Sequence, residues 1–233
     1  MWLYDLNRWL LPAGRRIFSL EKHGFPLPAR DQPVLIAANH SSFLDPWVVG
    51  SVDPRREIHF LINERWYRRS RLWTALFDAW GVLPASSRSP WETIERVVGA
   101  LERGQSVGIF PEGRISPDGK IGRGRPGIAW MAALSGCPVV PCGLRGVFEV
   151  LPKGRRLPRR HPVSIHLGRP MVFADGPVSD PNRSQLHDFA GRLMARICEL
   201  AGQEERAEAA MAVDPGADLV PEPPNPRRDP GPG

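Results

Sequence analysis

The stretch N-H-S-S-F-L-D, residues 39–45, constrains this chain more than any other, because it puts reactive side chains at a junction between two regular elements. The apolar run 34–38 before it predicts a buried strand, and residues 46–49 after it predict the first turns of a helix. Ligands of open α/β sheets bind at such junctions. Either serine of the turn is expected to cap that helix. With His40 in the turn, the carboxylate of Asp45 can reach back to its ring, which predicts a general base and the group that orients it.

A plainer interpretation of these two residues is a loop histidine and a first-turn carboxylate that stabilises the helix dipole. Two later stretches favour the catalytic interpretation. Residues 107–110 (V-G-I-F) predict another buried strand, closed by P-E-G-R-I-S at 111–116, and C-P-V-V-P-C at 137–142 opens a further strand. In this order, over roughly residues 30–175, the three stretches resemble the glycerolipid acyltransferases, the 1-acylglycerol-3-phosphate acyltransferase family, whose motifs are N-H-x4-D, F-P-E-G-T-R-S and a V-P-V-V-P-like strand.

This resemblance implies an O-acyltransferase that needs no cofactor and no metal. Its acyl donor would be acyl-CoA or an acyl carrier protein. Its acceptor would be the free hydroxyl of a lysophosphatidic acid in phospholipid synthesis, with glycerol 3-phosphate or another lysophospholipid or glycolipid as alternatives. His40 would remove the hydroxyl proton while Asp45 holds the ring, without an acyl-enzyme. Glu112 and Gly113 would lie at the acceptor, where Glu112 either contacts acceptor hydroxyls or only braces the turn.

Two arginines depart from the family pattern. The family has Thr-Arg-Ser after the motif glycine, whereas this chain has Arg114-Ile115-Ser116. Arg114 is therefore the expected phosphate ligand, since a guanidinium matches phosphate through paired donors. The stretch G-V-L-P-A-S-S-R at 81–88 occupies the place of the family's phosphate-binding second motif, and there Arg88 stands one position later than the pattern predicts.

The chain carries a net charge of +6 and has eight tryptophans against two tyrosines. The charge predicts an anionic partner, and the tryptophans favour a lipid surface over nucleic acid. Trp66, Trp73 and Trp80 have heptad spacing in a predicted helix 63–80 with arginines on its other side, so the stripe faces either an anionic membrane or the protein core. The basic run 153–161 is either solvated charge or a contact for acidic lipid or the acyl carrier's phosphates.

One acyltransferase domain, residues 1–202, and a disordered Pro/Gly-rich tail, residues 203–233, fit the length and composition. About the first 18 residues predict an amphipathic helix that either lies in a membrane interface or packs on the domain. No stretch reaches the ~20 apolar residues of a membrane span, and the three cysteines fit a reducing compartment. We therefore expect a cytoplasmic protein, peripheral on the inner face of the cell membrane.

Strands and helices alternate along the chain, which predicts an α/β fold with a mostly parallel sheet flanked by helices, and the resemblance implies its glycerol-3-phosphate acyltransferase-like version. Two other classes fit less well. A nucleic-acid-binding module would show a motif besides its charge, and a metal-dependent hydrolase using His40, Asp45 and Glu112 would need compact ligand spacing. The G-x-G-x-x-G at 122–127 does not directly follow a strand, so it predicts a basic loop rather than a nucleotide site.

Overall fold

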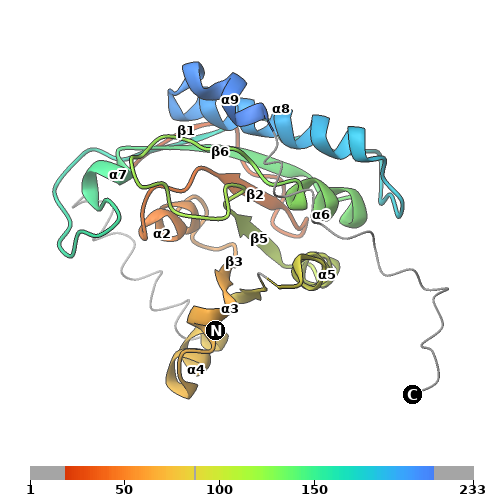
Figure 1. Ribbon diagram of the computed structural model, residues 1–233, viewed down its shortest axis with the longest axis horizontal. Coiled ribbons are helices and arrows are strands. Elements are labelled where there is room, and N and C mark those ends of the chain that lie inside the picture. Colours follow the sequence, from red (N-terminus) through yellow and green to blue (C-terminus); the bar gives the residue numbers. More distant parts are fainter. Residues whose placement is uncertain (1–18, 87, 213–233) are drawn as a thin grey trace.

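A seven-stranded sheet forms the centre of the protein, in a computed structural model that describes residues 19–86 and 88–212 (Figure 1). The strand order is β1-β7-β6-β2-β5-β3-β4. All neighbouring strands run parallel except β6 and β7, which confirms the predicted mostly parallel sheet. The strands are β1 (Glu21–Gly24), β2 (Leu35–Ala38), β3 (Ile58–Asn63), β4 (Leu83–Ala85), β5 (Ser106–Ile109), β6 (Val139–Arg145) and β7 (Ser164–Leu167).

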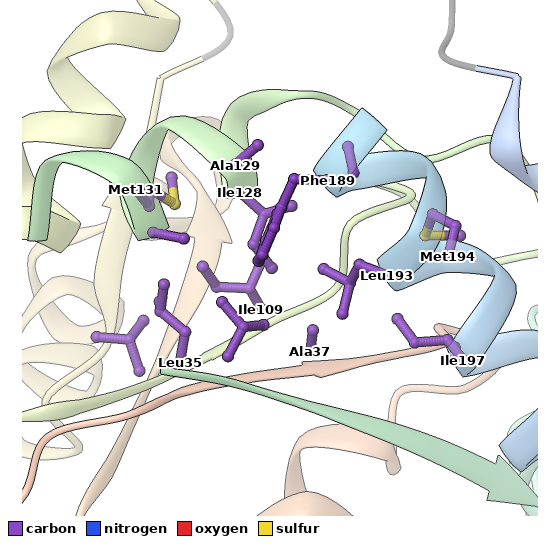
Figure 2. Close-up of a cluster of buried hydrophobic side chains, with 14 of the residues drawn as sticks. Leu35, Ala37, Ile109, Ile128, Ala129, Met131, Phe189, Leu193, Met194 and Ile197 are labelled. Carbon is purple, nitrogen blue, oxygen red and sulfur yellow. The ribbon is translucent and has the colours of Figure 1, made fainter. Parts of the chain in front are cut away.

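Alternate residues of β2 point to opposite faces of the sheet, and each set belongs to a different core. Leu35 and Ala37 pack with residues of α5 (Pro90–Glu102), α6 (Gly127–Ser135) and α8 (Arg183–Ala201), and Figure 2 shows part of this cluster between α6, α8 and the sheet. Ile36 and Ala38 pack on the other face with residues of α2 (Asp45–Gly50) and α7 (Val147–Val150). Because helices cover both faces, every position of β2 is apolar, as is usual for a central parallel strand.

Five strands of the sheet, β6, β2, β5, β3 and β4, run in the same direction, so their carboxyl ends lie along one edge, here called the carboxyl edge. The turn after β2 lies in the middle of this edge, next to Phe110, which follows β5. On one side α7 and the loop after it follow β6. On the other side α3 (Glu64–Tyr67) and α4 (Arg71–Ala79) follow β3. The predicted catalytic turn is therefore flanked by two surface segments.

The single helix predicted for residues 63–80 is instead two short helices, α3 and α4. The break falls at Arg68-Arg69-Ser70, because the Ser70 hydroxyl accepts a hydrogen bond from the backbone N–H of Trp73 and so begins a new helix. Neither helix contains a buried residue. Trp66, Trp73 and Trp80 keep 55%, 42% and 46% of their surface exposed, so the stripe does not belong to the core.

Two further segments differ from the sequence-based expectation. Residues 20–33, for which no strand is predicted above, contain an edge strand, β1, whose four residues are all exposed and which pairs with β7. The ordered chain also continues past the predicted boundary at residue 203, through a 3-10 helix (Glu204–Arg206) and α9 (Ala207–Met211). Ala210 is buried there, and the Gln203 side chain bonds to the backbone of Ile121 and Gly119, which attaches this segment to the domain.

The helix predicted for residues 1–18 and the tail beyond residue 212 lie outside the described residues. Within the described residues, no helix combines the length and the apolar character that crossing a membrane requires.

Candidate active site

His40 and Asp45 meet at the middle of the carboxyl edge, as their spacing predicts. The Nδ1 atom of His40 lies 2.8 Å from Oδ2 of Asp45. A carboxylate only accepts hydrogen bonds, so Nδ1 carries the proton and Nε2 keeps the lone pair that accepts a proton from a substrate. The Asp45 side chain is fully buried, whereas that of His40 keeps 16% of its surface exposed. The ring predicted to be the base is thus reachable, while the carboxylate that holds it is sealed from water.

Asp45 also holds the turn that carries His40. Its Oδ2 accepts the backbone N–H groups of Ser41 at 2.6 Å and Ser42 at 2.7 Å, in addition to the histidine ring. Neither serine caps α2, contrary to the sequence-based expectation, because the helix begins at Asp45 with Leu44 at the cap position and no side-chain cap. The Ser42 hydroxyl instead donates to the carbonyl of Leu151, tying the turn to the segment after α7.

The carboxylate of Glu112 fixes the backbone of His40 from the neighbouring strand end. Its Oε1 accepts the His40 N–H at 2.8 Å and its Oε2 accepts the Gly122 N–H at 2.9 Å. The N–H of Ser116 donates to the His40 carbonyl at 2.7 Å, so the 111–116 turn holds both backbone groups of the histidine. These contacts show the bracing alternative for Glu112, and its contact with an acceptor stays a prediction.

Burial determines the electrostatics of both carboxyl groups. Desolvation raises the pKa of Asp45, against the opposing effects of His40 and the two backbone N–H groups. Desolvation likewise raises the pKa of Glu112, against the N–H groups of Gly122 and His40. The site therefore keeps two carboxyl groups out of water and offsets part of the desolvation with backbone donors.

Two residues at the site have roles that the sequence did not reveal. The ring of Phe110 stacks on the His40 ring with centroids 4.0 Å apart and planes 14° apart. The side-chain amide of Asn39 exchanges two hydrogen bonds with the backbone of Leu144 on β6, at 3.1 and 2.7 Å. Phe110 fixes the imidazole plane, and Asn39 extends the β2–β6 pairing by one side chain. Phe110 reads as one more apolar strand residue, and only its place before the proline of the turn distinguishes it.

The predicted phosphate ligands lie at different distances along the carboxyl edge. Gly113 has a φ of +68° and Arg114 follows it, exposed, in the turn that braces His40. Arg125 lies against this glycine, because a Cβ built on Gly113 would come within 2.8 Å of its Nε. Arg88 is exposed after β4, the third strand from β2 in the sheet order. The structure thus places Arg114 in the turn that braces His40 and leaves Arg88 after β4, at the end of the sheet.

The arrangement suits removal of a proton by a neutral imidazole. Its partly exposed ring sits beside a buried carboxylate that can stabilise the imidazolium. The histidine's backbone, ring plane and tautomer are each held by one of the contacts above. Among the described residues, no group of three or more His, Cys, Asp or Glu is placed to hold a metal ion.

Comparisons with known proteins identify related sequences. A family model described as Acyltransferase matches residues 19–145. A 1-acyl-sn-glycerol-3-phosphate acyltransferase of Brassica napus, named as chloroplastic, is 30% identical over 136 residues, which are 55% of this chain and 37% of that protein. The Chlamydomonas reinhardtii enzyme of the same name is 28% identical over 174 residues, 72% of this chain and 49% of that protein. The chain thus spans less than half the length of these two relatives.

A solved structure has the same fold. The LPA acyltransferase PlsC from Thermotoga maritima superimposes with a TM-score of 0.63 at 18% sequence identity, over 87% of this chain and 79% of that one.

Proposed function

The chain belongs to the acyltransferase family, and from that premise we propose that it transfers a fatty acyl group from a thioester donor to the free hydroxyl of a lysophosphatidic acid. The observation that carries the proposal is the contact between His40 Nδ1 and buried Asp45 Oδ2 in the N-H-x4-D turn. The names of the relatives in Brassica and Chlamydomonas supply the acceptor class. Glycerol 3-phosphate is the alternative acceptor.

The reaction follows from the atoms at hand. Nε2 of His40 takes the proton of the acceptor hydroxyl as its oxygen attacks the thioester carbonyl. The new C–O bond forms, the C–S bond breaks, and the departing thiolate takes the proton back from the imidazolium. Asp45 stabilises the cationic ring in between, and a general base in this role contributes roughly 10²–10⁴-fold to the rate. Arg114, exposed beside Gly113 in the bracing turn, is the proposed ligand of the acceptor phosphate.

A purified chain with both types of labelled donor and a panel of acceptors tests this proposal. Lysophosphatidic acid should be converted to phosphatidic acid. Glycerol 3-phosphate and lysophosphatidylcholine should be acylated more slowly. The His40→Ala variant should lose this activity, and His23→Ala, a matched change of an exposed histidine on β1, should keep it. Absence of transfer from both donors to every acceptor would contradict the proposal.

We also propose peripheral attachment to an anionic membrane, on the cytoplasmic inner face of the cell membrane. Support comes from α3 and α4, which expose Trp66, Leu72 and Trp73. Exposed arginines lie on the same two helices and in the break between them, where Arg69 stacks over the Trp66 ring at 5.3 Å. Aromatic rings enter a membrane interface while arginines meet anionic headgroups. Because α3 and α4 lie on the carboxyl edge, such contact would bring His40 near the lipid acceptor.

Sedimentation with vesicles tests this attachment. The chain should pellet with anionic vesicles at low salt, release in high salt, and show a blue shift of tryptophan emission on binding. Trp66→Ser with Trp73→Ser should weaken pelleting, whereas Val172→Ser, which changes an exposed apolar residue near the opposite edge, should not. A chain that stays in the supernatant with anionic vesicles at low salt would rule the attachment out.

A further inference from the structure

The segment after α7, residues 152–161, here called the basic loop, begins beside the catalytic turn. Pro152 forms an isolated antiparallel bridge with Ser42, and the Ser42 hydroxyl donates to Leu151. Because β6 ends at the carboxyl edge and α7 follows it, the loop lies on that edge, on the opposite side of His40 from α3 and α4. A partner that binds this loop and carries an acyl thioester would therefore lie close to His40.

The charge of this loop has a single sign. Five cationic side chains are exposed there, and the sequence from 150 to 174 contains no aspartate or glutamate. Among the described residues, none of the five forms an ion pair with an acidic side chain. They are Lys153, Arg155, Arg156, Arg159 and Arg160. Unopposed charge of one sign attracts a partner of the other sign and speeds its association.

The shape of the loop favours a protein over a nucleotide or a bilayer. Its base is closed by a hydrogen bond from the Arg159 N–H to the Val150 carbonyl at 2.8 Å, and it projects from the domain (Figure 1). Nucleotide sites are concave, and interfacial membrane segments carry several apolar or aromatic residues. This loop has one large apolar side chain, Leu157, 75% exposed among arginines. Arginine around an apolar contact is typical of protein interfaces.

We propose that the basic loop docks an acidic acyl carrier protein, which presents its acyl thioester to His40. This inference rests on the proposed acyl transfer and adds the partner and the surface that receives it. Complementary charge would act on association and on the donor's KM, since charges at the rim of an interface mainly change the association rate and its salt dependence. The donor would then approach from the β6 side of His40 and the lipid acceptor from the β3 side.

Charge reversal at two residues tests the docking. Arg156→Glu with Arg160→Glu leaves in place the Nε bond of Arg155 to the Leu157 carbonyl and the closing backbone bond at Arg159. With the full chain and lysophosphatidic acid, the KM for the acyl carrier protein should rise roughly ten-fold or more and lose much of its salt dependence. The KM for acyl-CoA with the same acyl chain should stay within about two-fold.

A matched control carries the same change of charge elsewhere. Arg103 and Arg183 are exposed near the opposite edge, after α5 and at the start of α8, and their double change to glutamate should leave both donors' KM values unchanged. Affinity of the full chain for the acyl carrier protein without acceptor gives a second readout that needs no turnover. If the reversal variant does not fold, Arg156→Gln with Arg160→Gln should give a smaller rise in the KM for the acyl carrier protein, again with little change in the KM for acyl-CoA.

Several results would overturn the docking. The first two are an equal change in the KM of both donors and no change in either. The third is a wild type that does not use the acyl carrier protein. The fourth is a reversal variant that loses anionic vesicle binding with the carrier's KM unchanged, which would assign the loop to lipid. In each case transfer from acyl-CoA to lysophosphatidic acid by the wild type still reports on the proposed function separately.

Discussion

Replacing Asp45 by asparagine removes the charge of this residue while keeping its shape. Oδ2 accepts three N–H donors, from His40, Ser41 and Ser42, so the amide oxygen should take this position. The amide nitrogen then lies where Oδ1 lies, an atom that is buried and has no hydrogen-bond partner among the described residues. An unpaired buried group costs about 1–3 kcal/mol. We therefore expect the variant to fold, with Tm lower by roughly 2–12 °C.

The catalytic cost should be larger than the cost in stability. In the wild type, the cationic His40 ring is attracted to the Asp45 carboxylate, whose nearest atom is 2.8 Å from Nδ1. The Asp45→Asn variant loses this attraction. With the ring charge shared by both nitrogens, the separation is about 4 Å, and the attraction is about 4 kcal/mol at an effective dielectric constant of ~20. Because the amide oxygen keeps a weaker neutral bond, we expect kcat to fall roughly 10²–10³-fold.

Steady-state transfer to lysophosphatidic acid, measured beside thermal unfolding, checks this magnitude. Asp53→Asn is the matched control: it removes a carboxylate that pairs with Arg30 at 2.8 Å in the loop after α2, and kcat should not change. An Asp45→Asn enzyme within ten-fold of the wild-type kcat would refute the reasoning. A loss of activity fully explained by unfolding at the assay temperature would refute it as well.

Three further substitutions give separate outcomes. His40→Ala should remove transfer with the fold intact, and a tenth or more of wild-type activity would show that another group is the base. Arg114→Ala should raise the acceptor's KM roughly ten- to a hundred-fold, from the ~1.5–3 kcal/mol of a charge-assisted bond, with little change for the donor; equal changes would give Arg114 a structural role. Glu112→Gln should lower kcat more than it changes the acceptor's KM if Glu112 braces the turn. Burial raises the pKa of Glu112, so the folded protein holds that proton more tightly than the unfolded chain, and wild type gains stability as pH falls through the folded pKa. The Tm of wild type minus that of Glu112→Gln should therefore grow as the pH falls from 7 to about 5, a range that lies above the ordinary glutamate pKa. A flat or shrinking difference would contradict a raised pKa of Glu112.

The meeting of His40 with Asp45 and with the 111–116 turn was predictable, because the carboxyl ends of parallel strands share one edge and the motifs directly follow buried strands. The hydrogen bonds that Glu112 accepts from the backbone of His40 and Gly122 were not predictable, since an acid in a turn has the same sequence signature whether it binds substrate or backbone. The stacking of Phe110 on the histidine was hidden for a related reason. An aromatic residue after an apolar run looks like core.

The misassigned helix shows a limit of periodicity. Heptad spacing of Trp66, Trp73 and Trp80 favours one continuous helix, but Ser70 caps a second one and ends that register. Strand β1 was missed because all four of its residues are exposed, so no apolar alternation marks it. For the helix, the deciding contact is local and polar: the cap at Ser70. For β1 it is the pairing with β7, far along the chain. Hydrophobic spacing carries no information about either contact.

The hydrogen bond that closes the base of the basic loop also makes this segment exchangeable. With the Arg159 N–H fixed on the Val150 carbonyl, the residues between them can change in length at a modest entropic cost, about 0.6 kcal/mol for each doubling of loop length. The catalytic turn meets the segment at Leu151 and Pro152, at its very start. Residues 153–158 can therefore change while His40 keeps its geometry. If the loop docks the donor as proposed, a loop graft between relatives should transfer donor preference without rebuilding the active site.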